Sequence, residues 1–433
     1  MSPVQIGILG CIILFGLLFT SMPVAFAMIA TGVIGFAMIV SPHAAFSMVI
    51  ADLYETFSSY SLTVIPLFVM MGQVAFHAGI SKRLFRTAYA WIGHLRGGLA
   101  MATVGACAGF GAICGSGPAT AATMASVALP EMKHYGYDDS LASGTIAAGG
   151  SLGMLIPPSV VFIVYALMTE QSIGDLFLAG IVPGILIAGL FCISIFIRCT
   201  KNEKLGPAGP KHSWKVKIKS LNGVVETLLL FLLVMGGMFL GLFTPIEAAA
   251  IGAAGSFIIA FVQKELNFHK IKQILLETVR TSSMVFFIVA GATVFGRFLA
   301  VSRIPFTVAQ FFVSLPLPGW MVMMLIIGFF LIAGCFIDAL ALVTLTIPIF
   351  FPVILELGFD PIWFGVIVVV ITQMGVITPP VGVNVYVVSG IERDIPLPVI
   401  FKGALPFLLM LVIAAVILII FPQICLFLPN LLG

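Results

Sequence analysis

The sequence predicts an all-α, polytopic membrane protein, and three features of its composition lead to this fold class. Of the 433 residues, 61% are apolar and 9% are charged, whereas soluble domains carry roughly 45–50% apolar and about 25% charged residues. The apolar residues form long runs, and an α-helix that spans a bilayer needs about 20 of them. The 44 glycines and 25 prolines are typical of closely packed and interrupted membrane helices. This composition excludes a soluble enzyme, a disordered chain and a nucleic-acid-binding protein.

The chain consists of two homologous halves, because a shift of 222 positions aligns its structural glycines and prolines. The aligned pairs are Pro23 and Pro245, Gly97 and Gly319, Pro130 and Pro352, Gly136 and Gly358, Asp138 and Asp360, Gly153 and Gly375, and Pro157-Pro158 and Pro379-Pro380. So many matches at one offset are not chance. We therefore expect a first repeat over 1–198, a basic linker over 199–219 and a second repeat over 220–433.

Each half is predicted to contain the same elements in the same order. Two helices joined at a proline come first (4–20 and 24–41; 223–243 and 246–262), followed by an amphipathic connector on the membrane surface (43–60; 264–282) and a third helix (61–79; 283–299). An apolar stretch interrupted at its centre is next (99–132; 320–352), then a helix broken by Gly and Pro-Pro (139–168; 361–389) and a last helix (176–197; 398–420).

The two interrupted stretches are predicted to be re-entrant hairpins. The centre of the first, Cys114-Gly115-Ser116-Gly117-Pro118, does not continue a helix comfortably. The flanking helices of about 14 residues are too short to cross about 30 Å at 1.5 Å per residue. Each half then crosses the membrane five times, so the second half is inverted relative to the first. Inverted repeats with broken helices are the plan of many secondary transporters.

The distribution of charge predicts the orientation. With the linker in the cytoplasm, all but Arg297 and Arg303 of the 20 Lys and Arg residues lie on the cytoplasmic side or just inside the membrane. This agrees with the positive-inside rule, and it places both termini outside. The His and Cys residues are scattered without metal-ligand spacing, so no transition-metal site is expected.

The hairpin tips are the first candidate functional residues. At the first tip, one half-helix ends in unpaired carbonyls that suit a cation, and the next begins with unpaired N–H groups that suit an anion. The alternative is a GxxxG-like packing contact. At the second tip Asp338 stands in place of Ser116. A carboxylate at membrane depth costs about 2.5–3.5 kcal/mol on insertion scales, so we expect a functional role for it, although a plain N-cap of the helix 339–352 is the alternative.

The two broken helices complete the candidate site. Proline removes an N–H group and blocks the preceding helical bond, which leaves free carbonyls. Together with Ser, Thr and Asp oxygens, these carbonyls form a hard-ligand set suited to Na⁺. The alternative is a pair of kinks in which Ser and Thr bond back to the helix. We expect two related ion sites flanking one substrate, with Ser116 near 149–153 and Asp338 near 373–378.

Two charged residues outside the hairpins have open roles. Glu247 lies in the first turn after Pro245, where the helix dipole favours an acid, so structural and functional roles are equally expected. Arg297 ends a predicted helix; it either extends outward to solvent or faces an external partner.

These motifs resemble the large membrane subunit of tripartite ATP-independent periplasmic (TRAP) transporters over essentially the whole chain. The resembling residues are the run Gly111 to Thr120, Ile156-Pro157-Pro158-Ser159, Asp338 with Pro348 and Pro352, and the run Thr378 to Asn384. The resemblance implies a Na⁺-driven elevator, a separate small four-helix membrane subunit, and a periplasmic solute-binding protein that delivers a carboxylate-bearing substrate across a bacterial inner membrane.

The resemblance also assigns roles by motif position. The implied Na⁺ ligands are Ser116, Gly150, Gly153, Asp338, Gly375 and Thr378, and the implied substrate contacts are Gly117, Pro118, Thr120, Ser159 and Asn384. A C4-dicarboxylate, a sugar acid or a keto acid would each be compatible. No enzymatic activity is expected.

Three other functions are weaker readings of the same residues. A one-component Na⁺-coupled dicarboxylate or citrate symporter would use the same hairpins. An intramembrane serine protease would use Ser116, but its histidine base is missing at that depth. A purely structural scaffold would not need Asp338. ATP is excluded as the driving force within this chain, because it contains no GxxxxGK[ST] loop.

Overall fold

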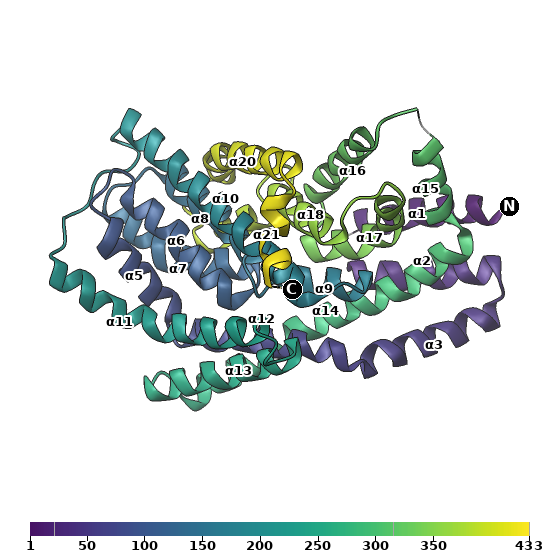
Figure 1. Cartoon of the computed structure of the whole chain (residues 1–433), viewed down its shortest axis with the longest axis horizontal. Helices are drawn as coiled ribbons and strands as arrows, with labels where there is room; N and C mark the ends of the chain where they lie inside the picture. Colours follow the sequence, from purple (N-terminus) through teal and green to yellow (C-terminus); the bar gives the residue numbers. More distant parts are fainter. Residues whose placement is uncertain (21, 315, 433) are drawn as a thin grey trace.

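The computed structural model describes residues 1–433 apart from positions 21, 315 and 433 and the side chain at 313, and all regular elements in this part are helical (Figure 1). The helices before the linker are α1 (Pro3–Phe19), α2 (Val24–Ile39), α3 (Pro42–Ser58), η1 (Tyr60–Thr63), α4 (Val64–His77), α5 (Ile80–Ile92), α6 (Gly98–Cys114), α7 (Gly117–His134), α8 (Asp139–Ser151), η2 (Leu152–Met154), α9 (Val160–Thr169) and α10 (Ile173–Lys201). The helices after it are α11 (Trp214–Phe231), η3 (Leu232–Gly236), α12 (Gly237–Phe239), α13 (Pro245–Val262), α14 (Phe268–Ser302), α15 (Ile304–Ser314), α16 (Gly319–Gly334), α17 (Ala339–Glu356), α18 (Pro361–Gly375), α19 (Val383–Ile391), α20 (Leu397–Ile420) and α21 (Gln423–Leu432).

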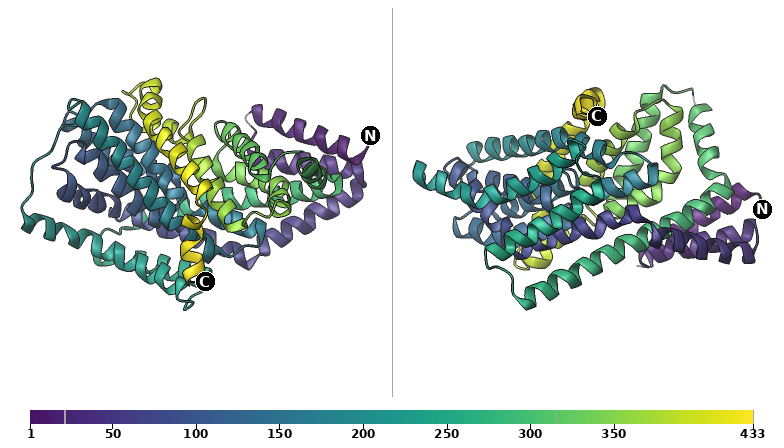
Figure 2. Two further views of the ribbon diagram at one scale, coloured as in Figure 1. Left: turned by 45° about the horizontal axis from the view of Figure 1, so that its top comes forward. Right: turned by 60° about the horizontal axis from the view of Figure 1, so that its bottom comes forward.

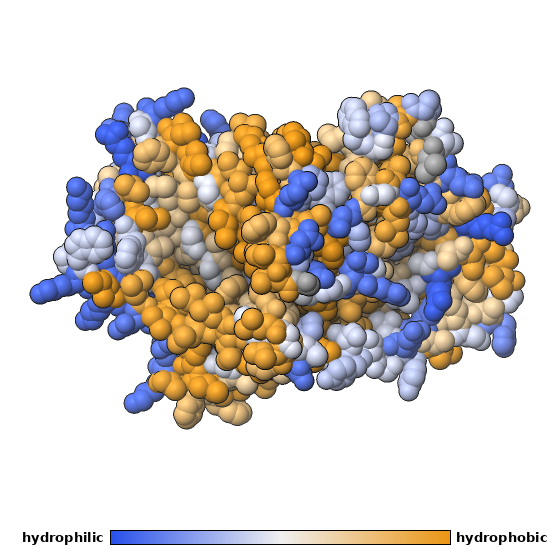
Figure 3. All heavy atoms as spheres, viewed as in Figure 1, coloured by the Kyte–Doolittle hydropathy of each residue, from blue (hydrophilic) through white to orange (hydrophobic). Residues whose placement is uncertain are grey.

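Seven helical stretches in the described part are long and apolar enough to cross a membrane. They are Tyr60–His77, Ile173–Lys201, Trp214–Phe239, Pro245–Val262, Phe268–Ser302, Ala339–Glu356 and Leu397–Ile420. Shorter apolar helices, such as Pro3–Phe19 and Gly319–Gly334, accompany them. Apolar side chains cover much of the visible face, while hydrophilic ones gather at its left and right edges and in a band from the centre toward the right (Figure 3). The chain is therefore a polytopic helical membrane protein.

Helix α14 corrects one expectation from the sequence. The connector 264–282 and the helix 283–299 were predicted as separate elements, but residues Phe268–Ser302 form one continuous helix of 35 residues. Asn267 caps its start by accepting a hydrogen bond from the Lys270 N–H at 2.8 Å. No glycine or proline interrupts the helix before Gly291, so nothing in the local sequence ends it at the junction. The segment leads into the membrane instead of lying only along its surface.

Four helices, α2, α4, α13 and α14, pack along one another and are called the wall helices below. Small residues allow this close packing. A Cβ at Gly291 of α14 would lie 2.7 Å from the carbonyl oxygen of Ala25 in α2, and a Cβ at Gly252 of α13 would lie 2.5 Å from the sulfur of Met71 in α4. The helix pairs α6–α7 and α16–α17 lie on the other side of the molecule together with α8, α10, α18 and α20 (Figure 1).

The connection between α10 and α11 lies at one end of the molecule, and the N-terminus lies at the opposite end (Figure 2). This connection is fixed to the base of the α6–α7 pair. The N–H of Gly97 donates to the Gly206 carbonyl at 2.9 Å, and the Tyr137 hydroxyl donates to the Pro207 carbonyl at 3.0 Å. The basic segment is thus held by residues directly before α6 and between α7 and α8.

Candidate functional site

The first tip interrupts the chain between α6 and α7. Helix α6 ends at Cys114 because Gly115 adopts a left-handed conformation (φ +66°) that a side chain rarely permits. Ser116 then caps α7, and its Oγ lies 3.5 Å from the N–H of Ala119. Pro118 occupies the first turn, where its missing N–H is not needed. The helix break expected at this point is present.

The first tip rests on the break between α8 and α9. The N–H of Val160 donates to the Gly115 carbonyl at 3.2 Å. A Cβ at Gly153 would lie 2.9 Å from the Ser116 carbonyl oxygen, so only glycine allows this approach. Helix α8 ends at Ser151 and passes into the short helix η2 before the prolines. Ser116 therefore lies against the segment 149–153, as expected.

The second tip interrupts the chain between α16 and α17. Asp338 caps α17, and its Oδ1 accepts hydrogen bonds from the N–H groups of Leu340 at 3.0 Å and Ala341 at 3.1 Å. The tip packs on the end of α18, because a Cβ at Gly375 would lie 2.4 Å from the carbonyl carbon of Gly334. Asp338 and Val376 share one cavity, so this tip also lies at its own break.

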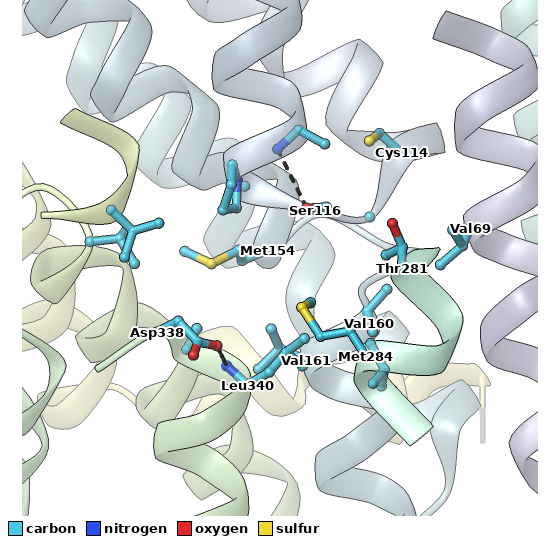
Figure 4. Close-up of a pocket in the computed structure, with 18 of the residues that line it drawn as sticks. Val69, Cys114, Ser116, Met154, Val160, Val161, Thr281, Met284, Asp338 and Leu340 are labelled. Atoms are coloured by element: carbon cyan, nitrogen blue, oxygen red, sulfur yellow. Dashed lines mark hydrogen bonds between the residues drawn. The ribbon is translucent and has the colours of Figure 1, made fainter. Parts of the chain in front are cut away.

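A cavity of about 460 Å³ separates the two tips, a volume within the usual range for small-molecule sites. Ser116, Gly117 and Pro118 line one side of it, and Asp338 lines the other (Figure 4). The remaining lining is mainly apolar and includes Met154, Val160, Val161, Met284, Val376 and Val383. Within the described part of the chain, no Lys, Arg or His lines it.

Asp338 is the charged group of this cavity, and its two carboxylate oxygens have different surroundings. Oδ1 caps the helix, whereas no other described residue donates a hydrogen bond to Oδ2. A carboxylate oxygen that is free of donors is a ready ligand for a hard cation. Capping and cation binding are therefore compatible in this geometry.

The other residues assigned from the sequence lie outside the cavity lining, and their polar groups bond to backbone. Thr120 Oγ1 donates to the Ser116 carbonyl at 2.8 Å, and Thr378 Oγ1 donates to the Met374 carbonyl at 2.6 Å. Ser159 caps α9 and donates to the Met154 carbonyl. Gly150 packs against Ala121, where a Cβ would lie 2.6 Å away. Gly150, Gly153 and Gly375 contribute close backbone contacts between tip and break.

Asn384 and Gln373 join the second half of the chain to α8. Asn384 Nδ2 donates to the Ala147 carbonyl at 3.0 Å, and Gln373 Nε2 donates to the Ser151 carbonyl at 2.9 Å. Both side chains are fully buried. Ser151 is the last residue of α8 and the N-cap of η2, so Gln373 binds the chain where one helix passes into the next. Asn384 was assigned to the substrate, but the structure places it in this buried seam.

Glu247 and Arg297 have partners within the chain. Glu247 Oε2 accepts a hydrogen bond from the Thr244 N–H at 2.8 Å, and the Thr244 hydroxyl accepts one from the Glu247 N–H at 3.3 Å. This capping box gives Glu247 a structural role. Arg297 Nε donates to Asp52 Oδ1 at 3.3 Å, and the Asp52 side chain is only 4% exposed. Arg297 thus binds a buried carboxylate on α3.

Two polar side chains of the cavity were not predicted from the sequence, namely Gln73 on α4 and Thr281 on α14. Gln73 did carry a signal, because it and His77 are the polar residues of an otherwise apolar helix. Thr281 carried none, since it lies in the polar first part of α14. Both reach the cavity through the packing of distant helices, which the local pattern does not reveal.

Comparison with known proteins assigns the chain to a family. The family model for the tripartite ATP-independent periplasmic transporter, DctM component, matches residues 11–424. The C4-dicarboxylate TRAP transporter large permease protein of Pseudomonas aeruginosa is 40% identical over 397 residues, which are 92% of each chain. The sialic acid TRAP transporter permease protein SiaT of Haemophilus influenzae is 34% identical over 88% of this chain and 61% of its own length.

A solved structure supports the fold independently. The YdaH transporter of Alcanivorax borkumensis resembles this chain with a TM-score of 0.64 at 16% identity, covering 88% of this chain and 89% of that one. At this identity the likeness concerns the fold alone. The family match over nearly the whole sequence is decisive, and the chain belongs to the DctM component family of TRAP transporters.

Proposed function

We propose that this chain imports a carboxylate-bearing solute by Na⁺-coupled secondary transport, through the cavity between its two tips. The observation that carries this proposal is the charge of that cavity. Asp338 faces it, whereas no Lys, Arg or His of the described part does. Two like charges about 4 Å apart repel by about 4 kcal/mol at an effective dielectric constant near 20. A carboxylate substrate therefore needs cations beside it.

The proposed ion sites follow the two tips. One lies at Ser116, Gly150 and Gly153, where α8 changes to η2 and its last carbonyls leave the regular helix. The other lies at Asp338, Gly375 and Thr378, where Asp338 Oδ2 is free of hydrogen bonds among the described residues. Gly117 and Pro118 then contact the substrate, because they line the same cavity. Na⁺ is the proposed coupling ion for both sites.

The proposed motion is an elevator, in which the tips and broken helices carry the substrate past the wall helices. The break in each half lies against its tip through glycine contacts, at Gly153 and at Gly375, which favours movement as one unit. The two halves are proposed to be inverted repeats in a bacterial inner membrane, with both termini in the periplasm. The N-caps Ser116 and Asp338, 222 positions apart, support this repeat.

The proposed partners are a small four-helix membrane subunit and a periplasmic solute-binding protein. The family name describes a tripartite transporter with this chain's family as one component. SiaT is longer than this chain, which covers 61% of it. The small subunit is proposed to be a separate chain. A C4-dicarboxylate is the first substrate to test, because the relative that is 40% identical is named for it.

Reconstitution tests this proposal directly. Proteoliposomes that contain the chain and its small subunit are expected to take up [¹⁴C]succinate only with Na⁺ and with the binding protein outside. Sugar acids and keto acids are the next substrates if succinate is not taken up. Na⁺-dependent uptake without either partner would instead identify a one-component symporter. Uptake that is equal in Na⁺ and choline buffers would contradict the proposed coupling.

A further inference from the structure

The cavity has a second side that the tips do not supply. Val69 and Gln73 of α4 line it, as do Thr281, Met284 and Val285 of α14. Residues three or four positions apart share one face of a helix, so α4 and α14 each turn a single face to the cavity. Figure 4 shows Thr281 between Val69 and the tip residue Ser116. A substrate held between the tips therefore also meets the wall.

Gln73 and Thr281 bring unused hydrogen-bond donors to that side. Within the described part of the chain, neither the Gln73 amide nor the Thr281 hydroxyl has a hydrogen-bond partner. Thr293, on the same helix, differs because its hydroxyl donates to the Val289 carbonyl at 3.1 Å. An amide NH₂ and a hydroxyl donate to a carboxylate, which Asp338 does not do when ionised. The wall thus offers the donors that an anionic substrate requires.

The position of these donors along the wall helices is also informative. His77 Nε2 lies 3.2 Å from Glu277 Oε2, within hydrogen-bond distance, and this contact aligns the end of α4 with the first part of α14. Gln73 precedes His77 by four residues, and Thr281 follows Glu277 by four. Each donor therefore lies about one helical turn, roughly 5.4 Å, from this contact. In the proposed topology that end of the wall is cytoplasmic.

The first tip contacts α4 at the same depth as Gln73. A Cβ at Gly72 of α4 would lie 2.9 Å from the Cα of Cys114, the last residue of α6. Only glycine permits such a close approach of the tip to the wall. The cavity in this structure therefore stands at the cytoplasmic ends of α4 and α14.

We infer that Gln73 and Thr281 contact the substrate carboxylate only while the cavity faces the cytoplasm. The inference rests on the proposed elevator, in which the tips move along the wall and the wall residues stay in place. When the tips move outward by more than a helical turn, Gln73 and Thr281 are left behind. These two residues then raise the affinity for the substrate at the cytoplasmic side, where it is released. They do not change the affinity at the periplasmic side, where it is taken up.

Sided kinetics test the inference in proteoliposomes of the complete transporter, selected for the orientation with the linker 199–219 in the lumen. One measurement is the half-saturation of [¹⁴C]succinate uptake, supplied outside on the binding protein. The other is the luminal concentration of unlabelled succinate that halves this uptake. Gln73→Met and Thr281→Val are expected to raise the luminal value roughly tenfold, the size of one lost charge-assisted hydrogen bond. Their external half-saturation should stay at the wild-type value.

Three further variants serve as controls. Thr281→Ser keeps the hydroxyl and should restore the wild-type luminal value. Thr293→Val and Gln310→Met remove the same groups at positions outside the cavity, and both should behave as wild type. Two results would overturn the inference but leave the proposed function intact. One is an equal rise of the external half-saturation and the luminal value; the other is a wild-type luminal value in Gln73→Met and Thr281→Val. A wild-type protein that takes up no succinate, sugar acid or keto acid with Na⁺ would refute the proposed function, and the inference with it.

Discussion

At the scale of single residues, Asp338 is the position where structure and proposed function meet. Its Oδ1 satisfies two N–H groups at the start of α17, and its Oδ2 remains available to the cavity. The chemistry of a carboxylate permits both roles at once. Ser116, its counterpart at the first tip, caps α7 with a neutral hydroxyl, so the two tips differ in charge although they share a geometry.

Replacing Asp338 by Asn separates these two roles. Asn caps a helix about as well as Asp, so Asp338→Asn should fold and still copurify with the small subunit. It lacks the formal charge, so Na⁺ binding should weaken by about 1.5–3 kcal/mol, a roughly ten- to hundredfold rise in the Na⁺ concentration for half-maximal uptake. A Na⁺ titration of succinate uptake measures this change. An unchanged titration curve would show that Asp338 is only a cap.

Gly375 tests the contact between the second tip and its break. The added methyl group in Gly375→Ala would lie 2.4 Å from the backbone of Gly334, and overpacking of this kind costs about 1–3 kcal/mol. We expect a lower unfolding temperature of the purified protein, measured by intrinsic fluorescence on heating. Gly296→Ala is the matched control, because no atom lies within 4 Å of its added Cβ. Equal unfolding temperatures in the two variants would contradict the close packing of the second tip against the end of α18.

At the scale of elements, the seam between α8 and α18 holds the two halves of the chain together. Gln373 Nε2 donates to the carbonyl of Ser151, the last residue of α8. These residues are 222 positions apart, as expected for equivalent positions near the axis of a repeat. The contact lies where α8 passes into η2. The seam therefore depends on a side chain from one half and backbone from the other.

Gln373→Met should destabilise this seam, because it removes the buried hydrogen bond to the Ser151 carbonyl while keeping a similar side-chain volume. A hydrogen bond of this kind contributes about 0.5–1.5 kcal/mol, so the unfolding temperature should fall relative to wild type. Gln310→Met, at an exposed position of α15, provides the control. If both variants unfold at the wild-type temperature, the Gln373 hydrogen bond does not contribute to stability.

The positions of the helix breaks could be predicted from the sequence more fully than the contacts of individual side chains. Gly115 and the Pro-Pro pairs impose breaks through their own backbone chemistry. This effect is local, so it can be predicted from the sequence. The orientation of Asn384 toward α8 depends on a carbonyl 237 positions away, and the contribution of Gln73 to the cavity depends on the packing of α4 against the first tip. Such tertiary contacts are not encoded in any local pattern.

At the scale of the whole molecule, the proposed inversion of the two halves predicts on which side of the membrane two positions lie. Single cysteines at 212, in the linker, and at 429, near the C-terminus, in a protein without its seven native cysteines, should react with reagents on opposite sides of the membrane. An impermeant maleimide added outside intact cells is expected to label position 429 and not position 212. Labelling of both from outside would contradict five crossings per half.

The central claim of this account is that Na⁺ and an anionic substrate occupy the cavity together and cross the membrane together. Parallel entry of ²²Na⁺ and [¹⁴C]succinate into proteoliposomes of the complete transporter tests it most directly. The cavity charge predicts that both enter in a fixed ratio, that ²²Na⁺ entry stops without succinate, and that succinate entry stops without Na⁺. Succinate entry at an undiminished rate in Na⁺-free buffer, or with no accompanying ²²Na⁺, would contradict the account.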